Sequence, residues 1–188
     1  MKKRERTRNN KPRRRVVVAV SGGFDPIHVG HVRLFHEAKK LGDELVVILN
    51  NDHWLRKKKN SVFMSQNQRR ELIEAFSDVD RVVITGHGPN PTDMTVTREL
   101  MAVRPDIFAN GGDRTPENAR DTSSSLNPEQ RLCSTLGIEM VFNVGHGGKV
   151  QSSSWLLAEY LERATGARSS APGRGRARRA SSKRNRLS

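Results

Sequence analysis

Two uninterrupted apolar runs constrain the fold of this chain more than any other feature. Residues 16–20 read Val-Val-Val-Ala-Val, and residues 45–49 read Leu-Val-Val-Ile-Leu. A strand with one face in water alternates apolar with polar residues, whereas a strand covered by helices on both faces is apolar throughout. Each run is five residues long, far short of the roughly 20 that a membrane helix needs. The runs therefore predict central strands of a parallel sheet and no membrane span.

The rest of the chain alternates short β-branched runs with longer amphipathic stretches, which is typical of βαβ units. We expect five parallel strands, at residues 16–21, 45–50, 82–85, 107–110 and 139–144. Helices are expected after each of the first four strands and at the end of the chain. Their predicted apolar stripes contain Leu34, Phe35 and Ala38, then Leu72, Ile73 and Phe76, and finally Leu157, Tyr160, Leu161 and Ala164. The other two of these helices are predicted at residues 95–103 and from Pro128 with Asn127 as its cap. The predicted class is an α/β, Rossmann-like doubly wound sheet.

Charge is concentrated at the two ends of the chain. Residues 1–15 carry +8 and residues 167–188 carry +8, which leaves −2 of the net charge of +14 for residues 16–166. The ends hold too little apolar surface to offset the entropy of ordering, so both are expected to be disordered basic tails. The predicted organisation is a tail at 1–15, one domain at 16–166 and an Arg/Ser-rich tail at 167–188.

The tails suggest an alternative function, because seventeen Lys/Arg would bind any polyanion through counterion release. The protein would then associate with nucleic acid, and its core would be subordinate or inactive. The core lacks a basic stripe and the tails lack interleaved aromatic residues, so only nonspecific binding is expected.

A lone cysteine, Cys133, excludes an intrachain disulfide, and the basic N-terminus is not followed by an apolar signal segment. Both observations favour a cytoplasmic location.

The sequence SGGFDPIHVGH at residues 21–31 lies where the first strand passes into the first helix. Ligands of open parallel sheets bind beyond the carboxyl ends of the strands. Gly22 and Gly23 allow close approach of a ligand to the backbone, and the helix N-terminus offers free N–H groups to a phosphate. His28 and His31, three residues apart, would fall on one side of the first helical turn. This arrangement favours phosphoryl chemistry.

The H-x-G-H box after the first strand resembles that of the cytidylyltransferase-like nucleotidyltransferases, of the glycerol-3-phosphate cytidylyltransferase or heptose-1-phosphate adenylyltransferase type. Further segments resemble the family in the same order over about residues 16–160. They are residues 50–52, the basic run 56–59, residues 68–70, residues 111–113 with 116–117, and the serines 152–154. The resemblance implies transfer of a nucleoside monophosphate from CTP or ATP to a sugar phosphate or polyol phosphate, by direct in-line attack that releases pyrophosphate. Mg²⁺ is implied, carried by the substrate phosphates, with no metal ligands from the protein.

The resemblance also implies roles for individual residues. The catalytic residues would be His28, His31 and Lys58. The nucleotide would be bound by Gly22, Gly23, Phe24, Lys57, Lys59, Arg69, Gly112, Asp113, Ser152, Ser153 and Ser154. The acceptor would be bound by Asp25, Asn50, Asp52 and Arg114. A homodimer is common in the family, although no residue pattern here shows one.

Two positions depart from the family pattern. Asn110 stands where adenylyltransferase members usually have Lys, and the usual Arg ahead of the serines has no aligned counterpart. Arg114 and Lys149 are candidate replacements. Because Lys is a point charge and Arg a planar fork, either exchange alters the geometry of phosphate recognition.

Each candidate also has a purely structural interpretation. His31 alone could be a hydrogen-bonded core histidine, and a zinc site at His28 and His31 would need further ligands that the sequence does not supply nearby. Asp25 could form an Asx turn before Pro26. The basic run 56–59 could be a solvated loop, the serines only a helix cap, residues 111–113 only a turn, and Trp54 either a base-stacking or a packing residue.

A fragment of an aminoacyl-tRNA synthetase shares the H-x-G-H box, but the chain is too short for that enzyme. A G-x-G-x-x-G dinucleotide fingerprint is absent.

Overall fold

The described residues form one parallel sheet. The computed structural model describes residues 13–112, 114–124, 126–145 and 152–165. The strands are β1 (Val17–Gly22), β2 (Glu44–Leu49), β3 (Arg81–Ile84), β4 (Ile107–Gly111) and β5 (Glu139–Val144), in the order β3-β2-β1-β4-β5. All four strand pairs are parallel. The predicted α/β, Rossmann-like fold is confirmed.

The central strand sets the position of the ligand edge. From β1 the chain winds outward through β2 to β3, and it then returns to the other side of β1 as β4. The order of the strands therefore reverses between β1 and β4. In a sheet of this kind, the crevice beyond the carboxyl ends at the reversal is where ligands bind.

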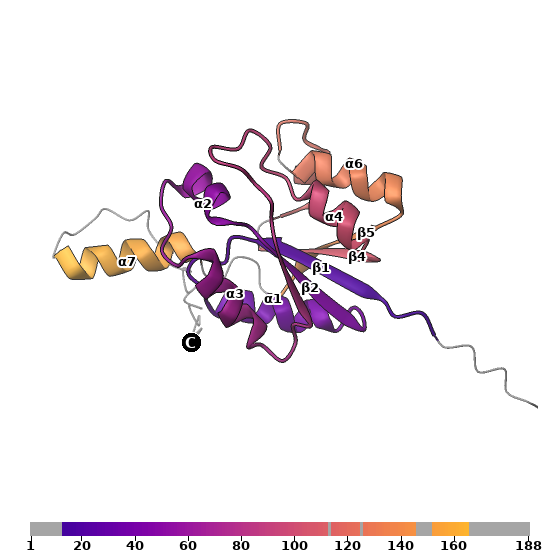
Figure 1. Ribbon diagram of the computed structural model, residues 1–188, viewed down its shortest axis with the longest axis horizontal. Coiled ribbons are helices and arrows are strands. Elements are labelled where there is room, and N and C mark those ends of the chain that lie inside the picture. The colour runs from indigo at the N-terminus through magenta and orange to yellow at the C-terminus, as the bar shows by residue number, and fades with distance from the viewer. Residues whose placement is uncertain (1–12, 113, 125, 146–151, 166–188) are drawn as a thin grey trace, which may run out of the picture.

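Helices cover both faces of the sheet (Figure 1). One apolar cluster joins the sheet to α1 (Val29–Lys39) and α3 (Gln66–Glu74) through Phe35, Ala38 and Ile73. The other joins it to α4 (Thr97–Val103), α5 (Pro116–Arg120) and α6 (Leu126–Leu136) through Leu100, Ala119, Leu126 and Cys133. Because both faces are covered, the runs at β1 and β2 are buried throughout most of their length.

Two helices lie at the edge where the strands end, on the left of Figure 1. They are α2 (Asp52–Lys59) and α7 (Ser153–Thr165). Neither α2 nor α5 was among the predicted helices. Both are short helices that side chains cap: Asn51 Oδ1 accepts from the N–H of Trp54, and Thr115 Oγ1 accepts from the N–H of Asn118.

Some side chains lie elsewhere than predicted. Leu72 was expected to face inward but is exposed, because Ile73 occupies the inner face of α3. Helix α6 begins at Leu126, so Asn127 is not its cap; its side chain donates to the carbonyls of Ala119 and Arg120 instead. Tyr160 and Leu161, at 66% and 58% exposure, do not face the core, because α7 extends away from the sheet (Figure 1).

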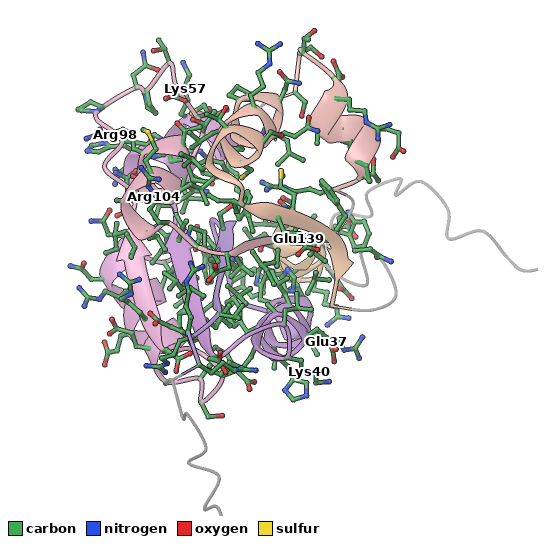
Figure 2. All side chains as sticks on the ribbon, turned by 90° about the vertical axis from the view of Figure 1, so that its right-hand side faces the viewer. Glu37, Lys40, Lys57, Arg98, Arg104 and Glu139 are labelled. Carbon is green, nitrogen blue, oxygen red and sulfur yellow. The ribbon has the colours of Figure 1, made fainter. Side chains whose placement is uncertain are left out.

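The outer surface of α1 carries charge. Glu37 and Lys40 form an ion pair of 2.7 Å and lie side by side there (Figure 2). No helix of the described residues has the length and apolar character to cross a membrane. Residues 1–12 and 166–188, which include most of the two predicted basic tails, lie outside the described residues.

Candidate active site

The turn after β1 is built around the ring of Phe24. Phe24 has a left-handed backbone, with φ of 49°, which is unusual for a residue with a side chain. Its ring folds back so that a Cβ on Gly22 would lie 2.9 Å from it, and any larger residue at that position would push the ring away. The same ring meets the imidazole of His31 edge-on, with centroids 4.9 Å apart. Phe24 thus fixes the position of His31.

His28 and His31 form a stacked pair at the start of α1. Their ring centroids are 3.7 Å apart. His28 Nδ1 accepts from the N–H of Gly30 at 3.1 Å, and His31 Nδ1 accepts from the N–H of His28 at 3.3 Å. A neutral imidazole that accepts at Nδ1 carries its proton on Nε2. The backbone therefore assigns both rings the tautomer in which Nε2–H is free to donate to a ligand.

Burial keeps both histidines neutral. Desolvation first, then the charges of His28 and Lys59, lower the pKa of His31 to about 3. Desolvation and then Lys59 also lower the pKa of His28. Two neutral donors can bind a phosphate oxygen without first losing or gaining a proton, which suits a site that stabilises charge rather than transferring protons.

The lowered pKa of His31 predicts a pH dependence of folding. Below the ordinary value of 6.5 the unfolded chain binds a proton on His31 that the folded chain does not bind until about pH 3. Stability contributed by His31 is therefore present above pH 6.5 and is lost as the pH falls from 6.5 toward 3, by at most about 1.4 kcal/mol per pH unit. Urea unfolding across this range should show a steeper loss for the natural chain than for His31→Gln. Equal slopes would contradict the prediction.

A cavity of about 320 Å³ lies beyond the ends of β1, β4 and β5. His28, His31, Lys59 and Arg114 give it two imidazoles, an ammonium and a guanidinium, and none of its described lining residues is acidic. The lining also includes Ser21, Gly22, Phe24, Gly30, Leu34, Asn110, Gly111, Gly112, Val144, Gly145, Ser152, Ser153 and Ser154. A concave site with this set of donors matches a polyanionic ligand such as a triphosphate.

Of the three consecutive lysines of α2, the structure brings only Lys59 to the cavity. Lys59 is half-buried, and its Nζ donates to the carbonyl of Asp25 at 3.0 Å. Desolvation is the main cause that lowers its pKa. Lys58 is exposed and does not line the cavity, and Lys57 lies at the surface (Figure 2), where it donates to Asn90 Oδ1. The catalytic role predicted for Lys58 therefore fits Lys59 better.

Arg69 does not reach the cavity, although it was predicted to bind the nucleotide. Its side chain is fully buried and pairs with Asp52 at 2.6 Å. Its other N–H groups donate to the carbonyls of Met64, Gly23 and Asn50. Arg69 thus ties the ends of β1 and β2 to α3, and its N–H groups are used mostly inside the fold, away from the cavity.

The burial of Arg69 predicts a loss of stability on substitution. Arg69→Met leaves Asp52 and three carbonyls, of which that of Asn50 is buried, without their donor, so the free energy of unfolding should fall by about 3 kcal/mol or more. Arg70→Met is the matched control, because Arg70 is exposed and pairs with Glu74 one turn away. Urea unfolding should show a loss within about 0.5 kcal/mol for that control. Similar stabilities of the two variants would contradict the structural role.

The residues predicted to bind the acceptor lie mostly outside the cavity. Both carboxylate oxygens of Asp25 accept backbone N–H groups, from Phe63 and Met64, so Asp25 fixes the loop before α3 rather than forming an Asx turn. Asp52 pairs with Arg69. Asn50 is buried, and its Oδ1 has no hydrogen-bond partner in the described part of the chain. Of the four, only Arg114 lines the cavity.

The other predicted residues also fall into two groups, those that line the cavity and those that do not. Ser152, Ser153 and Ser154 line the cavity, and Ser153 Oγ donates to the carbonyl of Pro26, which docks the start of α7 on the turn after β1. Gly112 also lines the cavity. Gly23 does not, because it faces Leu55 of α2. Asp113 and Lys149 lie outside the described residues.

Several cavity residues were not predicted. Gly111 ends β4 and Gly145 follows β5, and a Cβ on Gly111 would lie 2.9 Å from Leu34. The rule that ligands bind beyond the carboxyl ends of strands could have indicated both glycines. Trp54, which the sequence left as either a base-stacking or a packing residue, donates its indole N–H to the carbonyl of Met94 and so packs on the loop before α4.

The described residues contain no group of three or more His, Cys, Asp or Glu positioned to hold a metal ion. The carboxylates nearest the turn, Asp25 and Asp52, are already engaged by backbone N–H groups and by Arg69.

Comparison with known proteins shows which family the chain belongs to. Residues 19–130 match the family model described as cytidylyltransferase-like. The chain belongs to the cytidylyltransferase-like family. The family match spans β1 to the first turn of α6 and so includes the histidine pair, Lys59 and Arg114.

Relatives in this family differ in length and name. The chain is 32% identical over 145 residues to the FAD synthase of Thermoplasma volcanium, covering 77% of this chain and 94% of the relative. It is 42% identical over 99 residues to the FAD synthase of Aciduliprofundum boonei, covering 53% and 62%. It is 38% identical over 107 residues to the bifunctional protein HldE of Syntrophotalea carbinolica, covering 56% and 21%. The chain thus spans about a fifth of that HldE and less than two thirds of the second FAD synthase.

A solved structure shows the same fold. It is the lipopolysaccharide core biosynthesis protein from Thermoplasma volcanium GSS1, which is 28% identical, with a TM-score of 0.57 and coverage of 71% of this chain and 99% of that one. The strand order and the family match therefore agree in assigning the chain a cytidylyltransferase-like fold.

Proposed function

We propose that the chain transfers a nucleoside monophosphate from a nucleoside triphosphate to a phosphorylated small molecule. The observation that carries the proposal is the cavity that brings together His28, His31, Lys59 and Arg114 without a described acidic residue. In the proposed reaction an oxygen of the acceptor phosphate attacks the α-phosphorus. The bond from the α-phosphorus to the bridging oxygen breaks, and pyrophosphate leaves with the electron pair.

The roles of the residues follow from charge and geometry. The Nε2–H groups of His28 and His31 donate to the α-phosphate oxygens, where charge crowds in the transition state. Lys59 approaches the phosphates from the end of α2, and the serines at the start of α7 hold the leaving phosphates. The fork of Arg114 suits a further phosphate oxygen. Mg²⁺ enters with the triphosphate, which supplies its ligands together with water.

ATP is the donor we favour, and FMN is the first acceptor to test. Several relatives are named FAD synthase. FAD is FMN joined to AMP through a pyrophosphate linkage, and FMN is itself the phosphate of a polyol side chain. A substrate of this class also agrees with the sugar or polyol phosphate that the sequence suggests.

The test is Mg²⁺-dependent pyrophosphate release from ATP and from CTP, each with FMN, glycerol 3-phosphate and a set of sugar phosphates as acceptors. We expect release with ATP and one acceptor, together with a product that contains both. A folded chain that releases no pyrophosphate with either triphosphate, and still binds DNA in a salt-dependent manner, would favour the nucleic-acid alternative instead.

A further inference from the structure

Glu129 is a buried acid that folding alone does not explain. It lies in the first turn of α6 and is 4% exposed. Its Oε1 accepts from the N–H of Val96 at 3.1 Å, a bond that a glutamine could also make. Its Oε2 is buried without a hydrogen-bond partner in the described part of the chain. Leaving a carboxylate oxygen in this state costs stability, so a compensating role is expected.

The charged group that faces this oxygen is Arg114. Arg114 Nη1 lies 4.0 Å from Glu129 Oε2. The same Nη1 donates to Asn110 Oδ1 at 3.0 Å. Asn110 is itself fixed, because it is buried and its Nδ2 donates to the carbonyl of Phe108. One end of the guanidinium is therefore held by the neutral Oδ1 of Asn110, which accepts its hydrogen bond, and by the carboxylate of Glu129, which lies slightly farther away.

The other end of Arg114 is open. Arg114 lines the reaction cavity, and no residue in the described ranges accepts a hydrogen bond from its Nε or Nη2. A guanidinium held at one end can present the remaining N–H groups to two oxygens of a phosphate. Without an anchor, the long side chain would be free to turn toward solvent and would lose rotamer entropy on binding.

We propose that Glu129 is a positioning residue that, with Asn110, holds Arg114 ready to bind a phosphate oxygen of the substrate. This inference rests on the proposed function, because it takes the occupant of the cavity to be a phosphorylated substrate. The separation of 4.0 Å lets Glu129 orient Arg114 by charge without occupying a second N–H group. Burial raises the pKa of Glu129, and the charge of Arg114 acts in the opposite direction on that pKa, as expected if the two act as a pair.

A double-mutant cycle on the full chain tests this role. Calorimetry would measure the binding of a non-hydrolysable ATP analogue with Mg²⁺ to the natural chain, Arg114→Ala, Glu129→Gln and the double variant. The basic tails contribute equally to all four proteins, so their nonspecific attraction cancels. We expect Arg114→Ala to weaken binding by about 10-fold or more, since hydrogen bonds to charged groups have that magnitude. Glu129→Gln should weaken it several-fold, but less than about 2-fold when Arg114 is already absent.

The outcomes separate the two proposals. Equal losses from Glu129→Gln with and without Arg114, or no loss in either, would overturn the positioning role. Binding by the natural chain without pyrophosphate release would overturn only the proposed reaction, and a lack of binding would overturn both. If urea unfolding shows that Glu129→Gln does not fold, Glu129→Asp replaces it in the cycle. That variant keeps the charge but moves it away by one methylene, so its loss of binding should again vanish without Arg114.

Discussion

Replacing His31 by alanine should lower kcat for nucleotidyl transfer by about 100- to 1000-fold, the usual effect of removing one preorganised donor to developing charge. His31 lies in the cavity with Nε2–H free, because its Nδ1 accepts from the backbone of His28. Its donation strengthens as charge builds on the α-phosphate, so the loss should fall on kcat more than on KM. The measurement is the initial rate of pyrophosphate release at saturating triphosphate.

The control for this variant lies on the same helix. His36 is exposed and faces Asp78 at the surface, away from the cavity. His36→Ala should leave the rate within about twofold, because surface substitutions of this kind change stability little. If the His31 and His36 variants retained the same rate, the histidine pair would have no part in the reaction.

The second large effect is expected at Lys59. Lys59→Ala should reduce kcat/KM by about 10- to 100-fold, because it removes a charged donor that the end of α2 holds at the cavity. Its Nζ is held by the carbonyl of Asp25, so the side chain is in place before the ligand arrives. Steady-state kinetics with varied triphosphate would measure the change.

Lys58 provides a matched control, since it is the neighbouring residue with the same side chain. Lys58 is exposed and lies outside the cavity lining. Lys58→Ala should therefore retain nearly all activity, apart from a small loss of long-range attraction that disappears with added salt. A larger loss for Lys58→Ala than for Lys59→Ala would show that α2 turns its other face to the substrate during the reaction.

The sequence predicts the sheet well because the signals for it are local. The apolar runs at β1 and β2 identify buried strands, and the H-x-G-H box marks the turn that leads into α1. The capping box of Ser65 and Gln68 likewise predicts the start of α3, and the structure confirms it. Each of these features depends on residues within one or two turns of each other.

Features that depend on three-dimensional register could not be predicted from the sequence. Which lysine of the basic run reaches the cavity is decided by the rotation of α2, a helix that a polar stretch of this composition does not reveal. In the sequence Arg69 has the pattern of an exposed basic residue, and only the structure shows that carbonyls of three separate segments surround it. Glu129 reads as a surface acid because its partner, Arg114, lies in the loop before α5 rather than on the same helix.

The most direct test of the central claim is the state of the two imidazoles while a ligand binds. Long-range ¹H–¹⁵N NMR spectra of the histidine side chains can be followed during titration with a non-hydrolysable ATP analogue and Mg²⁺. The account predicts that His28 and His31 are neutral and protonated on Nε2 near neutral pH, and that their signals shift to saturation while those of His36 do not move. Protonation on Nδ1 in the free protein, or a titration that leaves both signals unchanged, would contradict it.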